Sequence, residues 1–269
     1  MRRADSLFVS GAYFEASIAF ERVYFEANAA DSRVNANLKK AQALKQLGEY
    51  GKALGDLRRS LTFRGEDALR RELLYEMAFC AYMDGNPDDA YGLLQQFRHH
   101  FGQDSGQRVY LLEGLILAEL QQWDELGDHL HDWVMSYADD PQLAQQMVAE
   151  YDTILLEAGR KGSRDPEKAR MWSTFVPGAG QLYAGEPGWG ALNVASQLVS
   201  LGAFALMAWN GYYIASVFAG LGPFQAFYFG GIRQAGMYAE AYEKSRREKT
   251  RAAVAAFLFD VAEIARSDR

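Results

Sequence analysis

Side chains that could bind a metal ion or move a proton are few in this sequence, and their spacing suits neither task. The four histidines fall into two close pairs, His99 with His100 and His129 with His131. Residues one or two positions apart do not share a face of a helix, so neither pair forms a natural metal site, and we expect all four rings to be solvated. Asp84, Asp88 and Asp89 flank a turn but lack the spacing of a calcium loop. The sequence therefore predicts no catalytic residues, no bound metal and no cofactor.

The cysteine content and the net charge exclude further classes of protein. Cys80 is the only cysteine, which rules out an intrachain disulfide and a thiolate metal cluster, and we expect it to pack as a small apolar residue. The formal net charge of -7 argues against a nucleic-acid-binding protein, which would present a basic face. The first residues are charged and polar, so they do not resemble a secretory signal.

A glycine-rich motif at residues 177–185 reads PGAGQLYAG. A phosphate-binding loop would end in lysine and a hydroxyl residue, whereas here Glu186 and Pro187 follow, so we do not predict nucleotide binding. The glycines permit turns that other residues resist, and the two polar side chains can satisfy backbone groups. The candidate residues of this motif are Pro177, Gly178, Gly180, Gln181, Tyr183 and Gly185.

The element that must position this motif is a long apolar segment. Between Arg170 and Arg233 lie 62 residues with a single charge, Glu186, although charged residues make up 23% of the chain. At about 20 residues per helix, the uncharged run can cross a bilayer twice. The dipeptide Asn210-Gly211 favours a reversal, so we predict spans at 189–209 and 212–232. A buried helical hairpin in a soluble protein remains the alternative.

Basic residues flank this hairpin on both sides, and its turn has none. Before it stand Arg160, Lys161, Arg164, Lys168 and Arg170, and after it Arg233, Lys244, Arg246, Arg247, Lys249 and Arg251. Positive charge marks the cytoplasmic side, which predicts both termini in the cytoplasm and contact with anionic membrane lipids. Small residues four apart, such as Ser216 and Gly220, either close the hairpin on itself or join it to another membrane protein. Pro223 should kink the second span.

The glycine-rich motif resembles that of small bacterial membrane domains with a two-helix hairpin, written proline-glycine-x-glycine-glutamine-x-tyrosine-x-glycine. The resemblance extends over about residues 165–242 and includes Tyr228 and Gly230 at the end of the second span. It implies an architecture and a bacterial inner-membrane location, but no activity.

The first 150 residues contain an internal repeat. Anchors 37, 37 and 36 residues apart are Gly11, Gly48, Gly85 and Gln121. A small residue precedes each anchor by seven positions, and further apolar residues recur at fixed offsets. This pattern suits antiparallel helix pairs and resembles the tetratricopeptide repeat, although the fourth copy lacks the glycine. It predicts an all-α chain with an α-solenoid of about four helix pairs, and a helix near 141–158 that caps the stack.

In the tetratricopeptide family, the first helices of the pairs form a groove that holds a peptide or a partner helix. By this resemblance, the groove residues are Tyr75, Phe79, Tyr82, Met83, Arg108, Leu111, Leu115 and Glu119. They are mainly apolar and aromatic, which suits a helix or a hydrophobic peptide. The alternative is that they pack against neighbouring helices or against the chain's own C-terminal segment.

We expect a repeat domain at 1–158, a linker at 159–166, a membrane hairpin domain at 167–242 and an amphipathic C-terminal helix at 243–269. The first helix of the first pair is short, so either the solenoid starts abruptly or residues are missing upstream. In the second case a lost signal peptide would place the repeats in the periplasm. The expected function is a non-catalytic, membrane-anchored interaction scaffold or assembly factor. The alternatives are a subunit of a larger membrane complex and a soluble interaction module.

Overall fold

The computed structural model describes residues 1–61, 65–102, 106–138, 140–160 and 162–267. Lys161, one of the predicted flanking cations, lies outside them. Every regular element in these ranges is a helix, in agreement with the predicted all-α class. The chain divides into two compact units, which we describe separately. Unit 1 comprises residues 1–152 together with 254–269, and unit 2 comprises residues 153–253.

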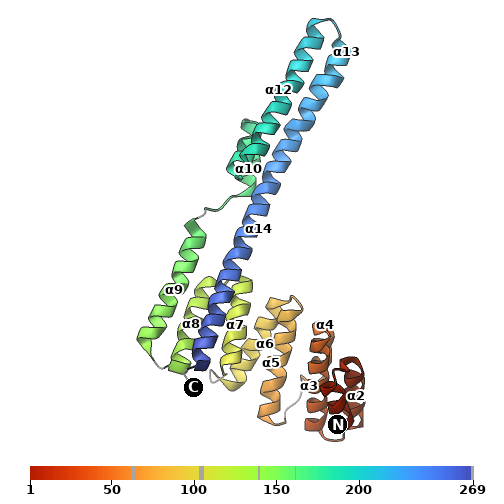
Figure 1. Ribbon diagram of the computed structural model, residues 1–269, viewed down its shortest axis with the longest axis vertical. Helices are drawn as coiled ribbons and strands as arrows, with labels where there is room; N and C mark the ends of the chain where they lie inside the picture. The colour runs from red at the N-terminus through yellow and green to blue at the C-terminus, as the bar shows by residue number, and fades with distance from the viewer. Residues whose placement is uncertain (62–64, 103–105, 139, 161, 268–269) are drawn as a thin grey trace. The chain divides into compact units, whose positions relative to one another are not determined.

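Unit 1 is a series of helices that pack side by side in chain order (Figure 1). They are α1 (Arg2–Val9), α2 (Tyr13–Glu26), α3 (Ala30–Gln46), α4 (Tyr50–Arg58), α5 (Asp67–Met83), α6 (Pro87–Phe101), α7 (Gln107–Leu120), α8 (Trp123–Ala138) and the first part of α9 (Pro141–Arg160). In addition to these sequential contacts, α3 touches α5 and α5 touches α7. The first helices of successive pairs therefore form one row.

The four anchors of the repeat adopt the same backbone conformation. Gly11, Gly48, Gly85 and Gln121 all have positive φ, between 58° and 81°. At each, the N–H of the next residue donates to the carbonyl five positions earlier at 3.0 Å, which closes the end of a helix. Glycine adopts this conformation without steric cost, whereas Gln121 is the only non-glycine residue with positive φ in the described ranges.

The recurring apolar positions fill the space within each helix pair. The residue seven before each anchor is buried every time, as Ala4, Ala41, Ala78 and Gly114. The residues five and nine after each anchor are also buried, and they belong to the second helix: Ala16, Phe20, Ala53, Leu57, Ala90, Leu94, Leu126 and Leu130. Small residues on the first helix thus admit large ones from the second, as the sequence pattern predicts.

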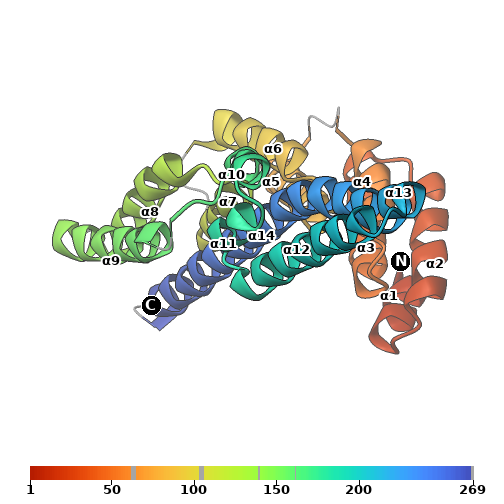
Figure 2. The ribbon, with the colours of Figure 1, turned by 90° about the horizontal axis from the view of Figure 1, so that it is seen from above.

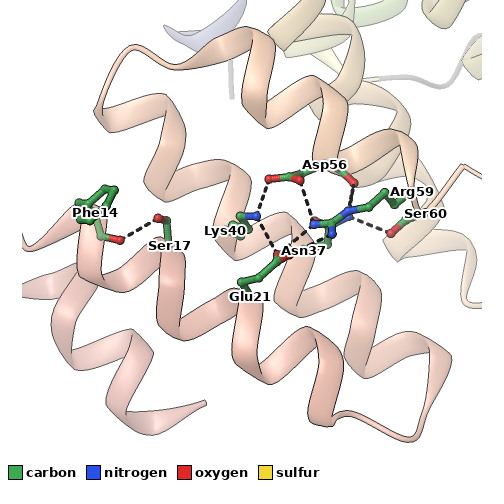
Figure 3. A network of polar contacts seen from close by, with 8 residues as sticks. All are labelled: Phe14, Ser17, Glu21, Asn37, Lys40, Asp56, Arg59 and Ser60. Carbon is green, nitrogen blue, oxygen red and sulfur yellow. Dashed lines mark hydrogen bonds and ion pairs between the residues drawn. The ribbon is translucent and has the colours of Figure 1, made fainter.

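A network of four charged side chains joins α2, α3 and α4 (Figure 3). Lys40 Nζ lies 2.7 Å from Glu21 and 2.6 Å from Asp56, and Arg59 lies 2.9 Å from both carboxylates. Hydrogen bonding to Arg59 lowers the pKa of Glu21 to about 2. Beside this network the amide of Asn37, fully buried, donates to the Asp56 carbonyl near the end of α4. These ion pairs and hydrogen bonds hold the second helix of the first pair against both helices of the second pair.

Unit 2 contains the end of α9, α10 (Pro166–Phe175), the short α11 (Ala179–Tyr183), α12 (Pro187–Trp209), α13 (Tyr213–Ser216), the π-helical turn η1 (Val217–Leu221) and the first part of α14 (Gly222–Ser267). Asp165 caps α10 by accepting from the Glu167 N–H at 2.8 Å, with Pro166 in the first turn. Figures 1 and 2 both show α12 running beside α13, η1 and the start of α14.

Among the described residues, only α12 is a helix long and apolar enough to cross a membrane. The second predicted span, 212–232, is divided among α13, η1 and the start of α14. The reason is Pro223, which has no N–H to donate to the preceding turn, and a π turn often accommodates such a break. After residue 232, α14 continues without interruption into the charged part of the chain.

Candidate partner-binding strip and glycine-rich motif

The predicted groove residues of α5 form a line of aromatic rings. Tyr75 and Phe79 stack with their ring centroids 6.4 Å apart, and Tyr50 of α4 meets Phe79 edge-on at 6.3 Å. Tyr82 is half-buried one turn further on, and Met83 is exposed. We call Tyr75, Phe79, Tyr82 and Met83, with the residues of α7 below, the aromatic strip.

Lys45 of α3 borders the strip on one side. Its ammonium group lies 4.9 Å above the centre of the Phe79 ring and 2.6 Å from the carboxylate of the buried Glu76. The Lys45 charge is therefore balanced within the protein and is not free for an anionic peptide terminus. This arrangement disfavours a carboxylate ligand.

Arg108 of α7 borders the strip on the other side. Its guanidinium lies 4.3 Å from the centre of the Tyr75 ring and forms an ion pair with Glu72. The aromatic faces of the strip are thus flanked by cations that already have carboxylate partners. Tyr75, Phe79 and Tyr82 are half-buried, so part of each aromatic ring stays accessible to an apolar side chain of a partner.

The predicted α7 residues Leu111, Leu115 and Glu119 are half-buried. On this helix, Gln107 donates from its side chain to the Ala265 carbonyl of α14. Gly114 faces Leu258, because a Cβ on this glycine would lie 3.2 Å from a Leu258 methyl group. Leu111 is four residues after Gln107 and three before Gly114, so it lies on the helix face that meets α14.

The C-terminal segment 254–267 of α14 therefore packs against α7 within unit 1 (Figure 1). The residues that its spacing placed on one face are buried: Val254, Phe257, Leu258, Val261 and Ala265. Because Gly114 has no side chain, Leu258 can pack directly against α7 at this position. The segment covers the α7 end of the aromatic strip, whereas Tyr75 and Phe79 contact residues of α3, α4 and α7.

The expectation that all four histidines are solvated is wrong for His129. Its side chain is buried in α8, where Nε2 donates to the Tyr110 carbonyl at 2.8 Å and Nδ1 accepts from Arg98 at 3.1 Å. Burial lowers the pKa of His129 to about 4 and raises that of the neighbouring Glu113 to about 7. The spacing of Leu126, His129, Leu130 and Trp133 is that of a buried helix face and could have identified the histidine.

The glycines of the motif make close approaches that a side chain would prevent. Gly178 follows the Pro177 turn with a φ of 82°, and its Cβ would lie 2.7 Å from the Gly190 carbonyl oxygen. Gly180 packs against α10, where its Cβ would overlap the Ala169 carbonyl oxygen and lie 2.8 Å from the Ala235 methyl group. Gly185 ends α11 with a φ of 81°.

The polar residues of the motif join α11 to α10, with its N-cap residue Asp165, and to α14. Gln181 is fully buried, donates to the Gly231 carbonyl of α14 at 2.8 Å and accepts from Ser173 of α10 at 3.1 Å. The Tyr183 hydroxyl accepts from the N–H of Asp165 at 3.1 Å. Each polar group is thus engaged within the protein, so the motif acts as a structural clasp and presents no free group for a ligand.

Four polar residues of unit 2 face its interior, whereas large apolar residues of α12, α13 and η1 face outward. Gln181, Gln197, Ser200 and Ser216 are buried. More than half of the side chain is exposed at Leu192, Leu198, Val199, Leu206, Ile214 and Phe218. Only 17% of the most apolar window of α12 is buried. Water-soluble proteins show the reverse arrangement.

The helix contact itself uses small residues. A Cβ on Gly220 would lie 2.5 Å from the Phe204 Cβ, so the two backbones approach closely there. Ser216 is buried one turn earlier. This pair therefore lies in the contact between η1 and α12, which is one of the two roles that its spacing allowed.

Comparisons with protein-family models, with characterised proteins and with solved structures find no match to this chain. Among the described residues, no group of three or more histidine, cysteine, aspartate or glutamate side chains is placed to hold a metal ion. Cys80 is buried, and burial raises its thiol pKa to about 12, so it is not a reactive nucleophile.

Proposed function

We propose that the chain is a membrane-anchored interaction scaffold without catalytic activity. In this proposal, unit 1 is an α-solenoid of the tetratricopeptide type, and α12 to the start of α14 form a two-helix membrane hairpin. The aromatic strip would bind an amphipathic helix or a hydrophobic peptide of a partner protein. The bacterial inner membrane is the proposed location, with unit 1 in the cytoplasm.

The observation that carries the anchor is the inverted polarity of the hairpin. Leaving six large aliphatic and aromatic side chains in water would be costly, at about 25 cal/mol per Å² of apolar surface. In a bilayer the same surface is solvated by lipid, and the inward-facing Gln181 and Gln197 are shielded from it. The soluble alternative would require another protein to cover this face.

Topology labelling tests the anchor. In a Cys80→Ala background, single cysteines are introduced by Asn86→Cys in the α5–α6 turn and by Asn210→Cys after α12, both at exposed positions. We expect an impermeant thiol reagent on intact cells to label position 210 alone. Labelling at position 86 alone would place unit 1 on the outer side, and labelling at neither or both would contradict a single hairpin of this orientation.

The strip is tested by partner capture with Phe79→Ala combined with Tyr82→Ala. The matched control is Phe14→Ala, an exposed aromatic residue of α2 outside the strip. We expect the double variant to lose partners that the wild type and the control retain, while its melting temperature still indicates a folded unit 1. Identical partners for all three proteins would refute the role of the strip.

A second candidate is a subunit of a larger membrane complex, for transport or membrane-protein biogenesis. The small pairs Ala191 with Ala195 and Ala215 with Ala219 remain exposed, unlike Ser216 and Gly220. Such exposed pairs four residues apart allow another helix to approach closely. Crosslinking from position 195 to a co-purified membrane protein would favour this candidate, and crosslinking to lipid alone would disfavour it.

A further inference from the structure

A groove with a volume of about 410 Å³ runs between α12 and the first part of α14, on one face of unit 2. Its walls are apolar, with Trp189 and Leu192 contributed by α12 and Phe227 and Met237 by α14. Gly230 also lines it and has open space where a Cβ would point. A side chain at this position would enter that open space.

The polar lining of the groove is uneven. Asn193 and Ser196 make their hydrogen bonds within α12, to Gln197 and to the Leu192 carbonyl. Arg233 and Gln234 follow the apolar part of α14, and both side chains are exposed. The exposed polar side chains of the groove, Arg233 and Gln234, therefore lie next to each other on α14.

Unlike Arg170 and Arg246, Arg233 has no carboxylate partner within the described ranges. Arg170 pairs with Glu240, and Arg246 lies 2.9 Å from Glu243. No acidic side chain is among the residues that line the groove. An unpaired guanidinium beside an apolar groove is complementary to an anion that carries a hydrocarbon chain.

We infer that this groove binds one anionic glycerophospholipid. Its phosphate would meet Arg233 and Gln234, and an acyl chain would lie along Leu192 and Phe227, across Gly230. Trp189 stacks on Tyr238 at 6.4 Å, in the position that aromatic rings take at the level of lipid headgroups. This inference rests on the proposed membrane anchor, because only a protein embedded in lipid would present the groove to an acyl chain.

Native mass spectrometry of the full-length protein in detergent tests the inference. The probes are phosphatidylglycerol and phosphatidylcholine with identical acyl chains, added in equal amounts. We expect the wild type to retain one phosphatidylglycerol preferentially, and Arg233→Gln to reduce that preference about tenfold, as for one lost charge-assisted contact. Gly230→Leu should reduce retention of both lipids, because its side chain would occupy the groove.

The matched control is Arg247→Gln, which removes the same charge from the same helix at an exposed position outside the groove. Equal losses in Arg233→Gln and Arg247→Gln would overturn the inference in favour of general surface attraction. So would a wild type that retains neither lipid or shows no preference between them. Flotation of the protein with phosphatidylcholine vesicles is measured in parallel, because failure to float would refute the membrane anchor itself.

Discussion

The substitution Gly180→Ala tests whether the glycine-rich motif is a packing clasp. A Cβ at this position would overlap the Ala169 carbonyl oxygen and the Ser173 hydroxyl and lie 2.8 Å from the Ala235 methyl group. The nearest of these atoms belongs to the backbone of α10, so a side-chain rotation cannot relieve the overlap, and α10 must move by about 1 Å or more. Overpacking of this kind costs about 3 kcal/mol at the upper end of its usual range.

The matched control is Gly230→Ala, in the same unit and also in a helix, where no atom lies within 4 Å of the added Cβ. We expect it to raise the free energy of unfolding by about 0.5–1 kcal/mol, because alanine favours a helix interior over glycine. Hydrogen–deuterium exchange of residues 166–185 reports the local opening. A cost of about 3 kcal/mol corresponds to exchange about two orders of magnitude faster in Gly180→Ala. Equal exchange in the two variants would show that the close approach at Gly180 does not hold α10 in place.

Three further predictions concern unit 1. Gln121→Gly should raise the free energy of unfolding by about 1 kcal/mol in chemical denaturation, because glycine relieves the left-handed strain, whereas Gly48→Ala should lower it. Leu258→Ala, at a fully buried position, should cost about 3 kcal/mol and expose the C-terminal segment to protease, but Phe259→Ala, at an exposed one, should not. Burial raises the pKa of Glu113 from 4.5 to about 7, so the folded state keeps a proton that the unfolded chain loses, and the stability that this group contributes is lost as pH rises through that window, whereas His129, whose pKa burial lowers to about 4, contributes in the opposite direction in both wild type and variant. Glu113→Gln cannot titrate, so unfolding curves should match near pH 4 and favour the variant by about 3 kcal/mol above pH 7.

The turns of unit 1 could be located from the sequence because their cause is local. A glycine at a fixed interval supplies the left-handed residue that ends each first helix, and this requirement is visible in a single repeat. Gln121 shows that the interval carries more information than the residue type. Its turn has the same hydrogen bonds as the three glycine turns.

The partner of the C-terminal segment could not be read from the sequence in the same way. Spacing places Val254, Phe257, Leu258 and Val261 on one face, but an apolar face does not specify what covers it. The complementary surface is created at Gly114 and Gln107, far away in the chain. For this reason the sequence predicts an amphipathic helix at 243–269 but does not identify its partner.

In the candidate sites, too, local features could be predicted from the sequence, whereas tertiary contacts could not. The glycines of the motif could be identified as turn formers, but the reason that Gly180 tolerates no side chain is its approach to α10, which is a tertiary contact. His129 was misjudged because its two partners, Arg98 and the Tyr110 carbonyl, come from other helices. A polar residue on an apolar helix face is costly unless such partners exist, and spacing alone cannot supply them.

The division of unit 1 into two stretches of chain has a consequence for biosynthesis. The ribosome releases residues 1–152 first, then the whole apolar hairpin, and only afterwards the residues that cover α7. Until Leu258 emerges, the nascent repeats expose the apolar surface around Gly114 that this side chain later fills. Under the proposed membrane anchor, insertion of the apolar segment would begin while unit 1 is still incomplete, so unit 1 would finish folding only after residues 254–267 have been synthesised.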